Sequence, residues 1–110
     1  HDLSTNRSWA LEAIEQYRRA VALGPAFADL RYKLARALLE TGDVLAAREE
    51  LESVVRDRPN FVDALASLGL ARYLSGDALG AEEVWRDCLT RRPEDARVEA
   101  YLAMLSRGAR

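Results

Sequence analysis

The sequence predicts an all-α fold in which antiparallel pairs of helices stack side by side into a solenoid. Pro25, Pro59 and Pro93 lie 34 residues apart, and the turn signal Gly42-Asp43 returns after the same step as Gly76-Asp77. A period of this length is typical of a helical unit repeated along the chain. Three further sets keep the step: Ala13, Ala47 and Ala81; Leu11, Leu45 and Leu79; Leu34, Leu68 and Leu102.

The first predicted helix covers residues 8–23 and corresponds to the second half of a repeat unit, with Ala13, Tyr17 and Ala20 in phase. Pro25 follows it and stops helical propagation. Residues 1–7 are polar and lack the apolar core of a signal peptide. We expect them to form a disordered or linker N-terminus.

Residues 28–61 form the first complete unit. Its first helix carries apolar residues with helical spacing and ends at Thr41-Gly42, where glycine allows a left-handed turn. Asp43 is expected to cap the second helix with its carboxylate. That helix must end before Pro59, which cannot donate a backbone hydrogen bond. The inward-facing residues of the two helices are Leu30, Leu34, Ala37, Leu38, Leu45, Ala47, Leu51, Val54 and Val55.

Residues 62–95 repeat this pattern, and residues 96–107 match only a first helix. Six helices are therefore expected. Small residues should let the helices of one unit approach closely, as Ala35 with Ala47 and Gly69 with Ala81. Large residues at the next contact position, Tyr17, Leu51 and Trp85, should fill the space between neighbouring pairs.

These spacings resemble the tetratricopeptide repeat family, whose unit has 34 residues with small, large and proline positions in a fixed order. The matching residues of the two complete units are Leu34, Ala35, Leu38, Ala47, Leu51, Val54 and Pro59, then Leu65, Leu68, Gly69, Ala81, Trp85, Cys88 and Pro93. Arg31, Arg72 and Ser106 replace large residues of the family pattern. The resemblance covers residues 8–107 and implies a right-handed superhelix.

The resemblance divides residues 8–110 into a partial repeat (8–27), two full repeats (28–61 and 62–95) and a final first helix or cap (96–107). Terminal units of such arrays are normally modified as caps. We therefore expect that the chain is a piece of a longer protein, or that a second copy covers its end.

The resemblance also implies a binding groove, because the first helices of the family line a concave face. Arginine can clamp a carboxylate through two N–H groups, and tyrosine gives rigid contact area. An extended peptide or a helix of another protein is the implied ligand. The corresponding residues are Asp29, Tyr32, Lys33, Arg36, Leu39, Asp63, Ala66, Leu70, Tyr73, Arg97, Ala100, Tyr101, Met104 and Arg107.

Some family members grip the terminal carboxylate of chaperones with lysine, asparagine and arginine at these places. Here no asparagine is present among them, so this mode is disfavoured. An acidic peptide held by Arg36, Arg97 and Arg107 remains open, as does the alternative that Tyr32 and Tyr73 pack between helices.

Composition disfavours other classes of function. The net charge of −2 gives no basic field for nucleic acid, and no apolar run approaches the ~20 residues that cross a bilayer. His1 is the only histidine and Cys88 the only cysteine, which leaves no histidine-based catalysis and no His/Cys metal site. We expect no enzyme activity, no metal and no cofactor.

Three residues outside the groove have specific expectations. Trp85 should lie in the core, and Cys88 should be a buried small hydrophobic residue rather than a nucleophile. Trp9 replaces a polar turn residue of the repeat, so it either covers the end of the stack, the preferred interpretation, or contacts a partner chain.

Three functions remain open from the sequence. The first is a non-catalytic scaffold that binds a partner in the groove. The second is an assembly module that forms a homo-oligomer by stacking through its terminal helices. The third is a regulatory segment of an enzyme whose catalytic domain lies outside this chain.

Overall fold

The computed structural model describes residues 3–24 and 27–108, and within α1 the side chains from residue 7 onward. The described residues form six α-helices and no strand. The helices are α1 (Leu3–Leu23), α2 (Ala28–Thr41), α3 (Val44–Asp57), α4 (Val62–Leu74), α5 (Ala78–Arg91) and α6 (Ala96–Gly108).

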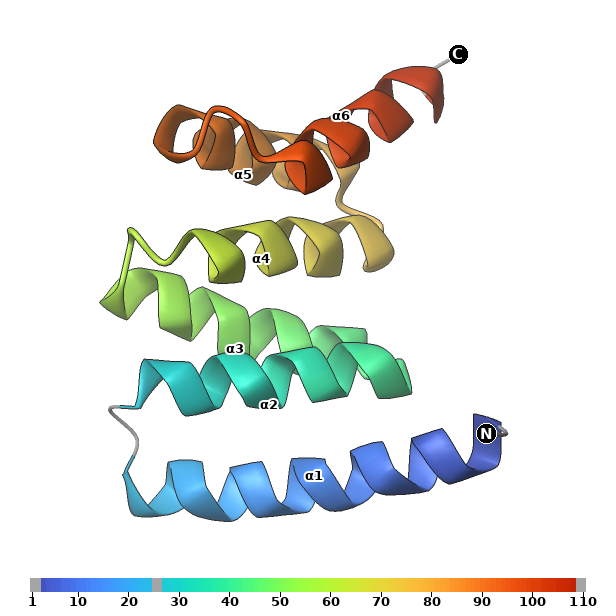
Figure 1. Ribbon diagram of the computed structural model, residues 1–110, viewed down its shortest axis with the longest axis vertical. Coiled ribbons are helices and arrows are strands. Elements are labelled where there is room, and N and C mark those ends of the chain that lie inside the picture. The colour runs from blue at the N-terminus through green and yellow to red at the C-terminus, as the bar shows by residue number, and fades with distance from the viewer. Residues whose placement is uncertain (1–2, 25–26, 109–110) are drawn as a thin grey trace.

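Each helix packs against the next one along the chain, so the six helices form a stack with α1 at one end and α6 at the other (Figure 1). α2 also contacts α4, which brings two first helices of the repeat side by side. The stack measures 40 × 34 × 23 Å. The all-α solenoid of antiparallel helices predicted from the period is confirmed.

The core runs along the stack and uses most of the repeated positions. The set of Leu11, Leu45 and Leu79 is exposed (50%, 67% and 81%), so the prediction that Leu45 faces inward is wrong. Ala35 and Ala47 are fully buried where α2 meets α3, and Leu51 and Trp85 are fully buried at the large-residue position. Gly69 shows how tight the contact is, because a Cβ added there would lie 2.5 Å from Trp85 Cδ1. Helix pairs of this closeness require the small residues that the sequence supplies.

The turns between the helices of each unit follow the glycine signals. Gly42 and Gly76 have φ of 86° and 93°, the left-handed conformation that favours glycine. Gly42 ends α2 and donates its N–H to the carbonyls of Leu38 and Leu39. Helix α3 ends at Asp57, two residues before Pro59, as the sequence predicts.

One predicted cap is wrong. Asp43 occupies the N-cap position of α3, but its side chain accepts no capping hydrogen bond, whereas Asp77 Oδ1 accepts one from Gly80 N at 2.8 Å. A Cβ on Gly80 would lie 2.8 Å from Asp77 Oδ1. Ala46 is the equivalent residue in α3, and its methyl group occupies the space that the capping carboxylate uses in α5.

The N-terminal segment also differs from the expectation. Residues 3–7 are the start of α1 instead of a disordered or linker segment, and residues 1–2 lie outside the described part. No glycine or proline interrupts residues 3–23, so the helix can continue along α2. Arg7 Nη1 donates to the Thr41 carbonyl at 3.4 Å, which ties this extension to the end of α2. Pro25 also lies outside the described residues.

Two arginines that depart from the family pattern find polar partners inside the stack. Arg31 Nη1 of α2 lies 3.1 Å from Glu50 Oε2 of α3, and both side chains are mostly buried. Arg72 Nη1 donates to the Gly80 carbonyl at 3.4 Å. A polar bridge between the two helices of a unit thus replaces the apolar contact that the family pattern would supply.

Candidate functional site

The residues predicted for the groove lie on the first helices of the units, α2, α4 and α6, and we call this surface the first-helix face. Its members vary in accessibility, since Lys33, Arg36, Ala100 and Arg107 are exposed and Leu39 is half-buried. The structure brings some of them into contact and leaves others apart.

Aromatic and cationic side chains of α2 form one cluster with Phe61, the residue before α4. The ring of Tyr32 packs at 5.0 Å from that of Phe61, and the guanidinium of Arg36 lies 5.9 Å from the Tyr32 ring centroid. A cation over an aromatic face gains a modest attraction. Lys33 and Arg36 have no carboxylate partner among the described residues, so their charges remain available. Asp29 pairs with Arg58 at 3.6 Å instead.

The apolar part of the first-helix face lies on α4 and α6. Leu70 and Tyr101 are half-buried, and Tyr101 stacks on Trp85 with ring centroids 4.8 Å apart. Tyr73 and Met104 are accessible and line a hollow of about 280 Å³ between α4, α5 and α6. Tyr101 therefore contributes to the core. The Tyr73 ring lies 6.3 Å from the Trp85 ring but keeps exposed surface, and Met104 is half-buried.

Ala66 does not belong to the binding surface. It is only 1% exposed, and its carbonyl accepts a hydrogen bond from Trp85 Nε1 at 3.0 Å. Because the large indole comes from the neighbouring α5 and needs a polar partner when buried, it fixes Ala66 inside the stack. The prediction that Ala66 lines the groove is wrong.

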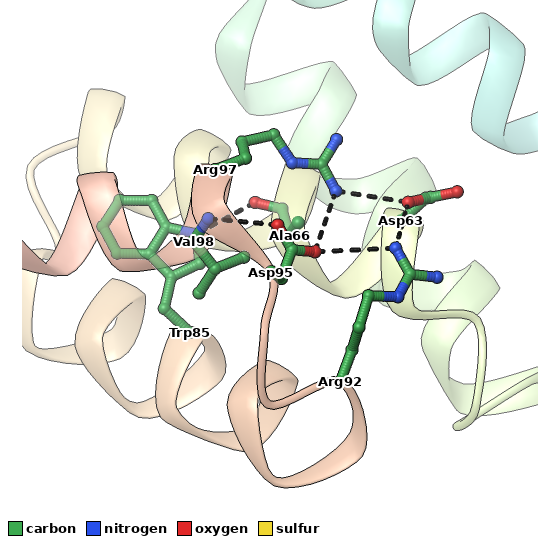
Figure 2. A network of polar contacts seen from close by, with 7 residues as sticks. All are labelled: Asp63, Ala66, Trp85, Arg92, Asp95, Arg97 and Val98. Carbon is green, nitrogen blue, oxygen red and sulfur yellow. Dashed lines mark hydrogen bonds and ion pairs between the residues drawn. The ribbon is translucent and has the colours of Figure 1, made fainter.

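A network of two arginines and two aspartates joins α4 to the start of α6 (Figure 2). Asp63 Oδ1 lies 3.1 Å from Arg92 Nη1 and 3.2 Å from Arg97 Nη2. Asp95 Oδ2 lies 3.5 Å and 3.6 Å from the same two nitrogens. The side chain of Asp95 is only 7% exposed, and its Oδ1 accepts the Val98 N–H at 3.3 Å, which caps α6.

The network neutralises the cation that was expected to bind ligand at this place. Burial disfavours the charged form of Asp63, but the hydrogen bonds and positive charges of Arg92 and Arg97 outweigh it and lower the pKa of Asp63 below its ordinary value of 3.8. Burial likewise opposes the charge of Arg97, yet the hydrogen bond that Arg97 donates to Asp63 and the charge of Asp95 raise the pKa of Arg97. The Arg97 guanidinium is therefore already paired with two carboxylates.

Sequence reasoning missed Arg92 and Asp95, although part of the signal was present. Asp29 pairs with Arg58 in one unit and Asp63 pairs with Arg92 in the next, and both residue types return after 34 positions. A search for charges that repeat with the period would have found this pairing. No aspartate repeats at the position of Asp95. The equivalent residues in the two earlier units are Phe27 and Phe61, which precede α2 and α4.

Cys88 behaves as the sequence predicts. It is fully buried, and burial, followed by the charges of Asp87 and Asp95, raises the pKa of its thiol to about 11. Within residues 3–24 and 27–108, no three His, Cys, Asp or Glu side chains gather as a metal site would require. None of the described helices combines the length and the apolar character needed to span a membrane.

Trp9 lies at the end of the stack, on the side of α1 that no described helix covers. Its side chain is 69% exposed, so both interpretations of this residue, an end cover and a contact with a partner chain, stay open. Trp9, Ala13, Gln16 and Tyr17 border a hollow of about 610 Å³ on the outer side of α1, together with Glu12, Glu15 and Arg19.

The comparisons with known proteins agree with this geometry. The tetratricopeptide repeat model matches residues 10–73, more than half of the chain, from within α1 almost to the end of α4. The chain belongs to the tetratricopeptide repeat (TPR) family. No curated protein matches the sequence.

Several solved structures share the fold. The first TPR of Spaghetti (RPAP3), bound to an HSP90 peptide, is 18% identical, with a TM-score of 0.89 over 96% of this chain and 83% of that one. The Sgt2 TPR domain from Aspergillus fumigatus is 24% identical, with a TM-score of 0.85 over 96% of this chain and 72% of that one. MamA is 30% identical, with a TM-score of 0.69 over 80% of this chain and 48% of MamA.

Proposed function

We propose that this chain is a protein-interaction scaffold that holds a peptide or a helix of a partner protein against the first-helix face. The observation that carries the proposal is the cluster on α2, where Lys33 and Arg36 lie beside Tyr32 without a carboxylate partner in the described structure. Cationic side chains that lack a carboxylate partner and lie next to an aromatic ring favour binding of a ligand that carries a carboxylate.

The ligand chemistry follows from what stays accessible. Lys33 and Arg36 lie on α2 and Arg107 on the last turn of α6, whereas Tyr73 and Met104 are accessible apolar contacts on α4 and α6. Arg97 is occupied by Asp63 and Asp95. We therefore expect a segment with apolar anchors flanked by carboxylates, bound mainly through Arg36 and not through Arg97.

Structural neighbours support a peptide-binding role without specifying the partner. The Spaghetti domain is bound to an HSP90 peptide, and the second TPR domain of human RPAP3 is in complex with an HSP70 peptide. The latter is 22% identical, with a TM-score of 0.85 over 93% of this chain and 85% of that one. At these identities the fold is shared, and the identity of the ligand is not transferred.

A peptide-display selection on the immobilised chain, followed by affinity measurement with a fluorescent copy of the selected peptide, tests the proposal. Arg36→Glu should weaken binding about tenfold or more, since a charge-assisted hydrogen bond is replaced by repulsion. Arg56→Glu is the matched control, because Arg56 is exposed on the second helix α3. It should change the affinity less than about twofold.

Two results would contradict the proposal. One is a selection that yields no peptide above background. The other is a set of peptides that bind Arg36→Glu as tightly as the unmodified chain, because such peptides would use another surface.

A further inference from the structure

The six helices alternate between two types. α2, α4 and α6 are first helices of a repeat unit, and α1, α3 and α5 are second helices, because equivalent residues lie 34 positions apart. In both complete units the two types pack through equivalent positions, although the side chains at these positions differ. Ala35 and Leu38 of α2 meet Ala47 and Leu51 of α3, and all four are at most 2% exposed.

In α1, the residues equivalent to this buried second-helix surface are open. Ala13 and Tyr17 correspond to Ala47 and Leu51, yet both are only partly buried, and they border the 610 Å³ hollow with Trp9 and Gln16. We call Trp9, Ala13, Gln16 and Tyr17 the α1 end face. It has the pattern of a second helix that has no first helix beside it in the described structure.

In α6, the residues equivalent to the buried first-helix surface are open as well. Ala103 corresponds to Ala35 but is exposed, and Leu102 is only partly buried although Leu34 and Leu68 are buried. Glu99 and Ser106 complete this surface, which we call the α6 end face. The buried residue of α6 is Val98, which faces the stack.

We propose that the α6 end face of one copy packs on the α1 end face of a second copy and completes a repeat unit between them. The occupant follows from the interface already present inside the chain, since a second-helix surface is matched by a first helix and α6 is a first helix with its matching surface free. This inference does not rest on the proposed function, because the end-face residues are distinct from Lys33, Arg36, Tyr73 and Met104.

The side chains of the two end faces are complementary in size. Within the chain, Gly69 faces the large Trp85, leaving no room for a Cβ, and Ala35 occupies the same position opposite the smaller Leu51. Between copies, Ala103 would face Tyr17, a small residue against a large one. Leu102 would bury its remaining exposed surface in the same contact, and burial of apolar surface favours association.

The polar positions also match. Arg31 of α2 pairs with Glu50 of α3 at 3.1 Å. The residues equivalent to these in the two end faces are Glu99 and Gln16, a carboxylate acceptor and an amide donor. Their contact would be a neutral-to-charged hydrogen bond in place of the ion pair.

The contact is head-to-tail, because two different surfaces meet. Such an interface leaves one free end face on each partner, so association continues to longer chains of copies or closes into a ring. This property separates the proposal from a symmetric dimer and makes the test specific.

Light scattering on the 110-residue chain over about 1 μM to about 1 mM tests it, a range that detects weak association. The unmodified chain should increase in mass with concentration. Ala13→Arg blocks the α1 end face and Ala103→Arg blocks the α6 end face, and each should stay monomeric alone. An equimolar mixture of the two should form a dimer through the end faces that remain intact. Circular dichroism checks that both variants keep their helix content.

A second pair of variants leaves Ala13 and Ala103 unchanged and alters only the polar contact. Gln16→Glu alone places two carboxylates together and should weaken association severalfold. Adding Glu99→Arg recreates the Arg31–Glu50 pairing across copies and should restore it to the original strength or beyond.

Three outcomes overturn the proposal. The first is a chain that keeps the monomer mass at the highest concentration. The second is a mixture of Ala13→Arg and Ala103→Arg that stays monomeric while the unmodified chain associates. The third is a single variant that still dimerises alone, which would indicate a symmetric contact or another surface.

Discussion

At the scale of single residues, the contact between Gly69 and Trp85 shows how closely the repeat controls side-chain size. The sequence predicts a small residue at this position and a large one opposite, but it does not say why glycine is needed here when alanine suffices at Ala35. The structure supplies the reason, because Trp85 fills the space that a Cβ would need and its Nε1 is held by the Ala66 carbonyl.

Gly69→Ala should therefore destabilise the protein, although alanine is the better helix former. Overpacking costs about 1–3 kcal/mol, which exceeds the ~1 kcal/mol gained in helix propensity. Urea unfolding measures the change. Gly108→Ala is the matched control, since a Cβ there meets nothing within 4 Å, and it should be neutral or slightly stabilising.

A double variant identifies the cause. In a Trp85→Leu background, which reproduces the Ala35–Leu51 pairing of the preceding unit, Gly69→Ala should lose most of its cost. An equal cost in both backgrounds would show that the indole is not the obstacle.

At the scale of helices, the network of Asp63, Arg92, Asp95 and Arg97 fixes the start of α6. Its two carboxylates and two guanidiniums come from α4, from the turn after α5 and from α6, so it joins three consecutive elements (Figure 2). Asp95 also caps α6 through Val98 N. The position of α6 thus depends on these ion pairs as well as on apolar packing, because α6 buries few apolar side chains against the stack.

The lowered pKa of Asp63 predicts a loss of stability in acid. A carboxylate with a lower pKa in the folded chain stabilises the fold at pH values above the ordinary 3.8, and this contribution is lost as the pH falls below that value. Asp63→Asn should therefore cost up to about 1 kcal/mol at pH 7, since the side chain is half-exposed and screened. The difference between variant and unmodified chain should shrink towards zero at about pH 3.

Urea unfolding at several pH values provides the measurement. Glu83→Gln is the control, because Glu83 is exposed on α5 and forms no ion pair in the described structure. A cost of Asp63→Asn that is the same at pH 3 and pH 7 would exclude a role for its charge.

At the scale of the whole molecule, the 34-residue period was sufficient to predict the number of helices, their antiparallel order and the small and large contact positions. Several features escaped it, and three of them show why. The missing cap at Asp43 depends on one methyl group at Ala46, and the burial of Ala66 depends on which carbonyl the Trp85 indole reaches. The helical start of α1 depends on docking against α2. Each is a tertiary effect that a local pattern does not contain.

Stability should vary along the stack, because in a solenoid each element contacts only its neighbours. α4 contains six buried residues and α6 one. Backbone amides of α4 should exchange with deuterium at least about tenfold more slowly than those of α6 in dilute solution. Hydrogen exchange with mass spectrometry measures this. Equal rates in all helices would instead mean that the stack opens as a single cooperative unit.

The two tryptophans of the chain stand at opposite extremes of solvent contact, with Trp9 largely exposed and Trp85 fully buried. Each indole therefore emits in a different environment. A soluble quencher such as iodide reaches Trp9 in the folded protein, whereas the Trp85 signal is shielded until the fold opens. Fluorescence from the native chain can thus distinguish an event on the outer side of α1 from loss of the core, with no attached dye.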